Sequence, residues 1–308
     1  MRRRQTRIHP GLVGERTLVG SDYLSKPGLR VEYEAEIAPR TEAALRRVLG
    51  QVPFASGRPR RVLDLGAGTG AAGRAVRACF GEDVELVAVD KVPGPGILVA
   101  NLLRGVRPAG VSGRFDLIVC AHLLNEFGAS LDLDGRARLM AGWCRELLEP
   151  DGTCIAIEPA LRDTSRALLG VHDRLLAAGL HVAAPCFCQT ACPALQRERD
   201  WCHDSAEVLV AGRSRVDFSY LVLRQSAATA VDPSRYRVVS DPIKDKGRLR
   251  FFICGATGRF VLMRLDRDRS AANQALDQAR RGDVVVLPNL LLHEGGIRVV
   301  ADSAVVIG

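Results

Sequence analysis

One ten-residue stretch constrains the fold of this chain more than any other: Arg61-Val-Leu-Asp-Leu-Gly-Ala-Gly-Thr-Gly70. Its short apolar run at residues 62–65 predicts a buried parallel strand, and residues 71–80 predict the helix that follows. Between them, three glycines allow the backbone to turn sharply and leave room for a ligand beside the main chain. Because a helix N-terminus beyond such a turn presents free N–H groups, the stretch predicts a nucleotide-like ligand.

Two acidic residues indicate which ligand this is. Asp90 ends the next predicted strand, residues 84–90, where a carboxylate can accept both ribose hydroxyls of NAD or of S-adenosylmethionine (SAM). Asp64 precedes the first glycine by two residues, where it repels a pyrophosphate and attracts the ammonium of a methionine moiety. The stretch resembles motif I of class I SAM-dependent methyltransferases; a glycine turn in an unrelated α/β protein is the alternative. The resemblance implies a SAM site that includes Asp64, Gly66, Ala67, Gly68, Gly70 and Asp90.

Two further residues are candidates for this site. Asn101, within residues 97–103, is a candidate contact to an adenine. His122 follows the predicted strand at residues 115–120, and ligands in open α/β sheets bind at the C-terminal ends of strands. The histidine is either a functional group or a hydrogen-bonding residue at a helix start, and both interpretations stay open.

The remaining periodicity predicts a doubly wound, Rossmann-like α/β sheet of the class I methyltransferase type. A helical pattern within residues 23–50 ends at Gly50, a plausible C-cap, before the first strand. After the fourth strand, helices alternate with strands, and the expected elements are helix 133–148, strand 153–158, helix 162–178, strand 181–184 and a last strand 218–223.

Four cysteines lie within 17 residues of an insertion before that last strand: Cys186, Cys188, Cys192 and Cys202. Thiolates this dense in a reducing compartment usually hold zinc or an iron–sulfur cluster. The paired C-x2-C knuckles of common zinc sites are absent. The alternative is a set of buried apolar cysteines, an interpretation that suits Cys79, Cys120, Cys144 and Cys154.

A series of short motifs resembles one family, the methyltransferase-like proteins of the small ribosomal subunit, which are found in bacteria and mitochondria. The resemblance covers about residues 20–285, and the cysteine pattern is its most specific part. After motif I, the matching motifs are Ile157-Glu-Pro159, Ala184-Pro-Cys186, Cys192-Pro193, Asp200-Trp-Cys-His203, Phe218-Ser-Tyr-Leu221, Lys244-Asp-Lys-Gly247, Cys254 and Arg281-Gly-Asp283.

The resemblance implies a 4Fe–4S cluster and a role as an assembly or maturation factor on small-subunit rRNA. The implied cluster ligands are Cys186, Cys192, Cys202 and Cys254. Where the family usually has Cys-Pro-His, this chain has Cys186-Phe-Cys188. The spare thiol leaves the fourth ligand open, and zinc is the alternative metal.

Charge is concentrated toward the C-terminus. Residues 235–281 hold 12 Lys or Arg against five Asp or Glu, so this window carries +7 of the chain's net charge of +8. A basic region beside a nearly neutral one favours a polyanionic partner, with RNA as the leading candidate and a solvated basic surface as the alternative. Short predicted strands, including one over residues 297–306, suit a small barrel of the OB-like type.

The expected organisation is a basic N-terminal arm at residues 1–20, a methyltransferase-like domain at 21–227 with its cysteine-rich insertion at 185–203, and a basic β-rich domain at 228–308. The longest apolar runs fall short of the ~20 residues of a membrane span, and the N-terminus lacks the apolar core of a signal peptide. We expect a monomer of the cytoplasm or mitochondrial matrix with no membrane partner.

Catalytic residues cannot be named from the sequence. Amino-group methyltransferases use an Asn/Asp-Pro-Pro-aromatic run after the fourth strand, whereas this chain has Cys120-Ala-His-Leu123. Cytosine-C5 enzymes use a Pro-Cys nucleophile there, but valine precedes Cys120. A SAM-dependent rRNA methyltransferase is therefore predicted beside one alternative, a non-catalytic assembly factor that binds SAM and RNA. A metabolic small-molecule methyltransferase would leave the cysteines and the basic region unexplained.

Overall fold

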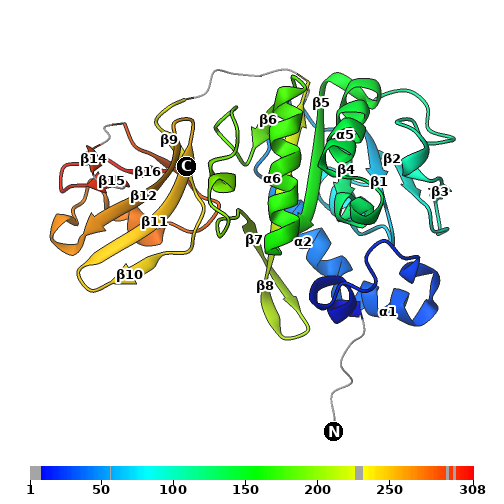
Figure 1. The fold of residues 1–308 in the computed structure, drawn as a ribbon, viewed down its shortest axis with the longest axis horizontal. Coiled ribbons are helices and arrows are strands. Elements are labelled where there is room, and N and C mark those ends of the chain that lie inside the picture. The colour runs from blue at the N-terminus through cyan, green and yellow to red at the C-terminus, as the bar shows by residue number, and fades with distance from the viewer. Residues whose placement is uncertain (1–7, 56, 226–231, 289–290, 294–295) are drawn as a thin grey trace, which may run out of the picture.

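Two eight-stranded sheets organise the chain, with the N-terminal helices below the first (Figure 1). The computed structural model describes residues 8–55, 57–225, 232–288, 291–293 and 296–308. The first sheet contains β1 (Arg61–Leu65), β2 (Glu85–Asp90), β3 (Ile97–Val99), β4 (Phe115–Ala121), β5 (Leu148–Pro159), β6 (His181–Ala184), β7 (Asp204–Val210) and β8 (Arg213–Arg224). The second contains β9 (Arg235–Val238), β10 (Ile243–Asp245), β11 (Arg248–Gly255), β12 (Gly258–Leu265), β13 (Val284–Val286), β14 (Leu291–His293), β15 (Gly296–Val299) and β16 (Val306–Ile307).

The helices agree with the periodicity of the sequence. The α-helices are α1 (Pro27–Glu36), α2 (Ala38–Leu49), α3 (Ala71–Phe80), α4 (Leu123–Glu126), α5 (Leu133–Leu147) and α6 (Arg162–Ala177). Short helical turns are η1 (Pro10–Gly14), η2 (Tyr23–Ser25), η3 (Leu102–Arg104), η4 (Phe127–Ala129), η5 (Pro193–Gln196), η6 (Asp266–Asp268) and η7 (Gln274–Gln278). The predicted helix at residues 71–80 matches α3, and α2 ends against Gly50 as expected.

The first sheet has the predicted doubly wound topology. Its strands pair in the order β3-β2-β1-β4-β5-β8-β6, with β7 paired to β8. The pairs from β3 to β5 are parallel, whereas β8 runs antiparallel to β5, β6 and β7. The chain moves outward from β1 to β3 and then returns to β4 on the other side of β1. This reversal leaves a crevice at the C-terminal ends of β1 and β4, where α/β sheets bind ligands.

Alternation along the central strands builds a separate core on each face of this sheet. Leu63 and Ile118 pack with Trp143 of α5, in a core that also includes apolar residues of α6. Val62 and Leu117 point the other way and pack with apolar residues of α2 and α3. Near-continuous apolar strands are expected where helices cover both faces of a parallel sheet.

The second sheet differs from the expected barrel. Among the described residues, its strands pair along an open path, β14-β15-β12-β11-β9-β13-β16, with β10 beside β11, so the OB-like barrel is not formed. The strand predicted over residues 297–306 is also wrong in its length. A turn at Ala301 and Asp302, closed by the bond from the Ser303 N–H to the Val300 oxygen at 3.0 Å, separates β15 from β16. Asp and Ser favour such turns.

The expected basic N-terminal arm packs onto the protein over residues 8–20, while residues 1–7 lie outside the described part of the chain. Ile8 is fully buried and packs with Tyr33 of α1 and with Tyr23. The Arg16 guanidinium donates a hydrogen bond to the Asn125 side chain. This segment folds back because its few apolar residues complete a small core with α1 and α2. The expected domain boundary at residues 227–228 lies outside the described residues.

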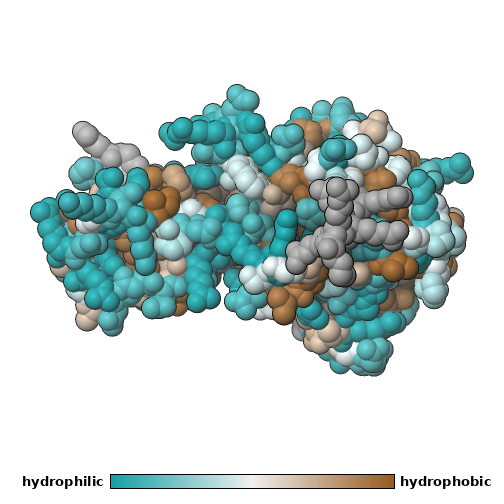
Figure 2. All heavy atoms as spheres, turned by 90° about the horizontal axis from the view of Figure 1, so that it is seen from below, coloured by the Kyte–Doolittle hydropathy of each residue, from teal (hydrophilic) through white to brown (hydrophobic). Residues whose placement is uncertain are grey.

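The surface of the two sheet regions differs in one view. Seen from below, the left part of the molecule, which holds the second sheet, is almost covered by hydrophilic side chains (Figure 2). Within the described ranges, none of the helices combines the length and the hydropathy that crossing a membrane would require.

Candidate functional site

The glycine turn after β1 adopts the conformation that its sequence predicts. Gly66, Gly68 and Gly70 have φ angles of 77°, 57° and 84°, in the region that favours glycine. A Cβ on Gly66 would lie 2.8 Å from a methyl carbon of Leu123, so the loop also approaches α4 closely. The Gly66 N–H donates to the Val89 oxygen at 2.8 Å, which fixes the loop to β2.

Asp90 holds this loop from the end of β2. One carboxylate oxygen accepts from the Gly68 N–H and the other from the Val92 N–H, each at 2.8 Å. A carboxylate offers about four lone pairs, so two remain for hydroxyl groups of a ligand. Asp90 is only 9% exposed and still lines the cavity described next. Its position suits a ribose contact.

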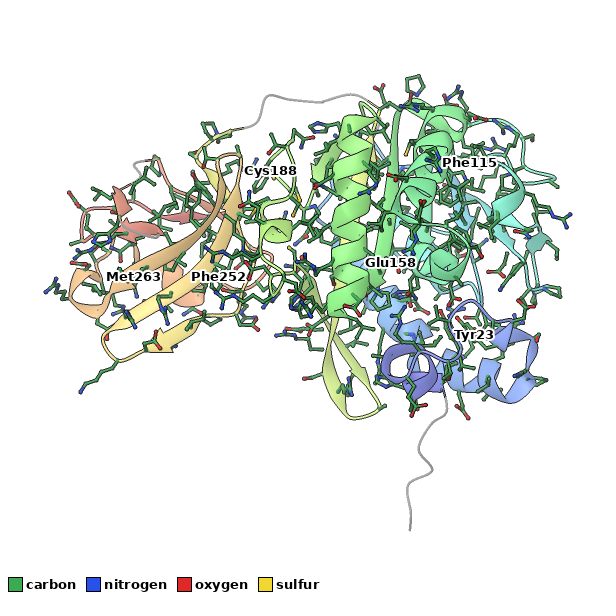
Figure 3. The ribbon with its side chains drawn as sticks, viewed as in Figure 1. Tyr23, Phe115, Glu158, Cys188, Phe252 and Met263 are labelled. Atoms are coloured by element: carbon green, nitrogen blue, oxygen red, sulfur yellow. The ribbon has the colours of Figure 1, made fainter. Side chains whose placement is uncertain are left out.

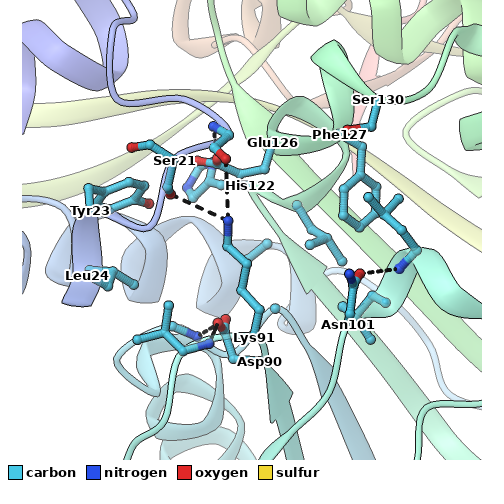
Figure 4. Close-up of a pocket in the computed structure, with 18 of the residues that line it drawn as sticks. Ser21, Tyr23, Leu24, Asp90, Lys91, Asn101, His122, Glu126, Phe127 and Ser130 are labelled. Atoms are coloured by element: carbon cyan, nitrogen blue, oxygen red, sulfur yellow. Dashed lines mark hydrogen bonds between the residues drawn. The ribbon is translucent and has the colours of Figure 1, made fainter.

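A cavity of about 220 Å³, the glycine-loop cavity, opens at these strand ends (Figure 4). Five of the predicted site residues line it: Gly66, Gly68, Asp90, Asn101 and His122. The Asn101 side-chain oxygen is used locally, because it accepts from the Leu103 N–H at 2.9 Å and caps η3. The structure thus brings together residues from β1, β2, β3 and β4 that are spread over more than 50 positions.

Three predicted site residues do not line this cavity: Asp64, Ala67 and Gly70. Asp64 is 1% exposed, and neither carboxylate oxygen has a hydrogen-bond partner within the described residues. Burial, followed by repulsion from Asp90, raises the pKa of Asp64 to about 7, while the Gly73 N–H lowers it by a smaller amount without reaching hydrogen-bond geometry. The carboxyl group lies beneath the loop, not on its open side.

His122 does not use its side chain to cap α4. Its backbone is left-handed, with φ 60° and ψ 19°, and its N–H donates to the Ile157 oxygen at 2.6 Å. The imidazole Nδ1 is buried without a partner among the described residues, and burial lowers the pKa of the ring to about 4. A neutral imidazole therefore faces the cavity at physiological pH.

Glu158, at the end of β5, performs the capping that the sequence suggested for His122. Its Oε1 accepts from the Leu124 N–H at 2.8 Å and from the Asn125 N–H at 3.2 Å. The side chain is 1% exposed, and burial raises its pKa to about 8 against the lowering effect of those two hydrogen bonds. Sequence reasoning noted this glutamate only within a family motif, since a cap supplied by another strand leaves no local signal.

The N-terminal segment forms one wall of the site, which sequence reasoning missed. The Gly20 N–H donates to the Glu126 carboxylate, and the Lys91 ammonium pairs with Asp22 at 2.7 Å. Lys91 also donates to the Gly20 and Ser21 oxygens at 3.4 and 3.5 Å (Figure 4). Tyr23 continues this wall and is drawn beside the N-terminal helices in Figure 3. The only signal in the sequence was the apolar residues scattered among the polar ones.

The cysteines of the insertion gather around a second small cavity, the cysteine cavity, of about 40 Å³. Figure 3 shows Cys188 in the segment between α6 and the second sheet. All four implied ligands and the spare thiol line this cavity, and one of them comes from β11: Cys186, Cys188, Cys192, Cys202 and Cys254. The insertion between β6 and β7 and strand β11 of the second sheet therefore contribute thiols to one place. Of the four cysteines interpreted as apolar, Cys120, Cys144 and Cys154 are buried, but Cys79 is exposed.

These thiols interact with one another and with nearby arginines. The proximity of the Cys186 and Cys254 thiols lowers the pKa of Cys188 and raises the pKa values of its two neighbours. Burial raises the pKa of Cys202, while the charges of Arg259, Arg281 and Arg237 oppose this rise. Among the described residues, no group of three or more His, Cys, Asp or Glu side chains is arranged to hold a metal ion.

A comparison with protein families assigns the chain. Residues 30–285 match the family described as mitochondrial small ribosomal subunit Rsm22. The chain belongs to the Rsm22 family. The match includes the glycine loop, the cysteine-rich insertion and most of the second sheet, and it confirms the resemblance stated from the motifs. No curated protein is similar enough in sequence to match the chain.

Solved structures similar to this Rsm22-family chain include methyltransferases. The plantazolicin methyltransferase BpumL in complex with SAH shares 10% identity over 68% of this chain and 97% of its own, with a TM-score of 0.44. An O-methyltransferase family protein from Burkholderia thailandensis shares 14% identity over 67% of this chain and 62% of its own, with a TM-score of 0.40. A TehB-like SAM-dependent methyltransferase from Corynebacterium glutamicum shares 19% identity over 60% of this chain and 88% of its own, with a TM-score of 0.35. The fold assignment itself rests on the sheet order and strand directions.

Proposed function

We propose that this chain is a SAM-dependent methyltransferase that acts on the RNA of the small ribosomal subunit. One observation carries the proposal: the glycine-loop cavity opens at the switch point of a doubly wound sheet, with Asp90 and the glycine loop on its wall. Open α/β sheets bind nucleotide-like ligands at this position. The Rsm22 family name supplies the small ribosomal subunit as the assembly on which the protein works.

The residues present fit SAM. Asp90 keeps two lone pairs for the ribose hydroxyls, Asn101 stands on the side expected for the adenine, and the Gly66–Gly70 loop leaves room for the rest of the ligand. When bound, SAM supplies a methyl group on a positively charged sulfonium, which an acceptor lone pair can attack. The chain's part is to bind, orient and desolvate the reactants.

The role of Asp64 changes within this proposal. Asp64 is buried behind the cavity and has a pKa raised to about 7, so it is partly protonated at neutral pH and contributes only part of a negative charge there. Together with Asp90 it favours a cationic ligand over a pyrophosphate at this position. Ala67 and Gly70 likewise shape the turn instead of facing the ligand.

Contact with RNA is supported by a cleft of about 510 Å³ between the two sheet regions, the basic cleft. Four arginines line it against two aspartates: Arg47, Arg224, Arg235 and Arg237, with Asp232 and Asp283. Phe187 lies on the same wall, and the Arg235 guanidinium stands 5.2 Å from its ring centre. Arginines interleaved with an aromatic ring suit a nucleic-acid strand.

An iron–sulfur cluster of the 4Fe–4S type is the finer part of the proposal, with zinc as its alternative. The donor set fits, because thiols are the ligands of such clusters and five of them line the cysteine cavity. Cys186, Cys192, Cys202 and Cys254 would hold the cluster, and Cys188 is the candidate to replace one of them. Nearby Arg237 and Arg259 would compensate the negative charge of the thiolates.

The domain arrangement follows from the same elements. We propose a methyltransferase-like domain over residues 21–227, with its insertion at 185–203, and a basic β-rich domain over 228–308. The cysteine cavity would then join the two domains. A monomer located in the cytoplasm or mitochondrial matrix completes the proposal.

The deciding experiment measures transfer of a labelled methyl group from SAM to immature small-subunit particles by the purified chain. Transfer that is lost in Asp90→Ala supports the enzyme. Tight SAM and RNA binding without transfer would instead support the non-catalytic assembly factor. A chain that binds NADH and not SAM would overturn the proposal.

A further inference from the structure

A cavity of about 280 Å³, the N-terminal cavity, adjoins the glycine-loop cavity and has no role in the function proposed above. The two cavities share four lining residues, Tyr23, Tyr33, His122 and Glu126, which we call the shared wall. The two cavities therefore adjoin at these four side chains, so a group bound in the N-terminal cavity lies beside a ligand bound at Asp90. The cavity exists because residues 8–25 fold back onto the sheet.

The N-terminal cavity is lined by apolar side chains together with polar and charged ones. Apolar contacts come from the N-terminal segment, the end of β5 and β8, and include Leu12, Val13, Ile37, Pro159, Leu161 and Val216. Asn125 joins the shared wall at one end and presents a side-chain amide whose oxygen already accepts a bond from Arg16. A cavity whose lining combines apolar side chains with a few hydrogen-bonding groups suits a heteroaromatic ring with a polar edge.

Two arginines give the cavity a cationic end. Arg40 is only 9% exposed, and its Nε has no hydrogen-bond partner among the described residues. Arg213 begins β8 at the tip of the β7–β8 hairpin and is exposed. By contrast, Arg215 is already paired with Asp217 at 2.6 Å and with Asp241 at 3.4 Å. Arg40 and Arg213 therefore supply the positive charge that an anionic ligand would meet.

The charges of Arg40 and Arg213 affect the pKa of His9, which lines the same cavity. After burial, Arg40 and Arg213 are the next causes that lower the pKa of His9. Burial alone lowers the pKa of His122. His9, Arg40 and Arg213 line the N-terminal cavity alone, whereas the uncharged imidazole of His122 lines both cavities.

We propose that the N-terminal cavity receives the methyl acceptor as one unpaired nucleotide of an RNA strand. Its base would lie between the apolar walls with its edge toward the shared wall, and its phosphate would meet Arg40 and Arg213. This inference rests on the proposed function and assigns its acceptor site. A mononucleotide combines the apolar ring, polar edge and anion that the cavity matches, whereas a lysine side chain would be repelled by the arginines. Enzymes that modify a base take it out of the stack into such a pocket.

The test uses the full chain saturated with S-adenosylhomocysteine (SAH) and the four nucleoside 5′-monophosphates, each compared with its nucleoside. Calorimetry or ligand-detected NMR should find at least one nucleotide that binds about tenfold more tightly than its nucleoside, because a charged hydrogen bond is worth about that factor. Arg40→Gln and Arg213→Gln should each remove most of this preference. Arg138→Gln, an exposed arginine on α5, is the matched control and should change nothing.

A cavity-filling variant separates this site from the cofactor site. Ala160 lines the N-terminal cavity and not the glycine-loop cavity, so Ala160→Trp should block nucleotide and nucleoside while SAH affinity is retained. Arg213 is exposed, so its variant provides a readout even if Arg40→Gln fails to fold. Equal binding of nucleotides and nucleosides, or nucleotide binding that survives both Arg213→Gln and Ala160→Trp, would overturn the inference. If the wild-type chain did not bind SAH, the proposed function would be overturned instead.

Discussion

Removal of the Asp90 carboxylate has two effects that can be measured separately. The carboxylate accepts two backbone N–H bonds, from Gly68 and Val92, in a site that is 9% exposed. Leaving a buried donor without a partner costs about 1–3 kcal/mol, so Asp90→Ala should lower the free energy of unfolding by roughly 2–6 kcal/mol. The lost ribose contact is a charge-assisted hydrogen bond worth roughly 1.5–3 kcal/mol, so SAH affinity should fall about 10- to 150-fold.

The assay is titration calorimetry with SAH, alongside thermal unfolding of each variant. Asp116→Ala is the matched control, because Asp116 accepts bonds from the Arg60 and Arg61 N–H groups at 2.8 and 2.9 Å, at the opposite end of β1. This control should lose stability but keep its SAH affinity. Asp90→Asn keeps one acceptor oxygen and should fall between the wild type and Asp90→Ala. If folded Asp90→Ala bound SAH as tightly as the wild type, Asp90 would not be at the ribose.

Three further predictions concern other parts of the molecule. Protein purified without oxygen should be brown. Cys254→Ser should bleach this colour and expose the junction between the sheets to protease, whereas Cys79→Ser should do neither. Bound zinc without sulfide would indicate the alternative metal. RNA affinity should fall steeply as the salt concentration rises. It should also be lower in Arg235→Glu than in the wild type, and unchanged in Arg138→Glu. An RNA affinity that did not depend on salt would mean that the basic cleft is a solvated surface and not an RNA-binding site. The pKa of Glu158 is about 8 in the folded state, against a usual value of 4.5. Between these two values the folded protein keeps a proton that the unfolded chain releases. The free energy of unfolding of the wild type should therefore decrease as the pH rises from about 5 to about 8. Glu158→Gln should remove up to roughly 4 kcal/mol of this decrease, and parallel pH profiles for the two proteins would contradict the buried carboxyl.

The choice of arginine for the RNA test shows what the fold adds to a charge count. Arg248 and Arg250 lie within the basic region at residues 235–281, yet both pair with Asp245 on β10. Arg235 is exposed and lines the basic cleft. Counting charges along the chain locates the basic region, but the partners of each charge depend on which strands become neighbours.

Local patterns explain why much of the fold could be predicted from the sequence. The strand, glycine turn and helix at residues 61–80 depend on interactions between residues close in sequence, and the structure matches them. Apolar runs likewise predicted the central strands of the first sheet. The second sheet was harder, because the length and pairing of short strands depend on neighbours that no local pattern specifies.

The sequence by itself determined the class of fold, the glycine loop with Asp90, and the set of cysteines that could act together. Each is a short-range feature, in which residue type and spacing already imply the local chemistry. Only the tertiary structure decided that Asp64 lies beneath the loop, that Glu158 caps α4, and that residues 8–25 close the site. The family resemblance implied that Cys254 joins the thiols of the insertion, and the structure places it on β11 at the same cavity. These contacts join segments up to about a hundred residues apart, and they form only when packing of the apolar faces brings those segments together.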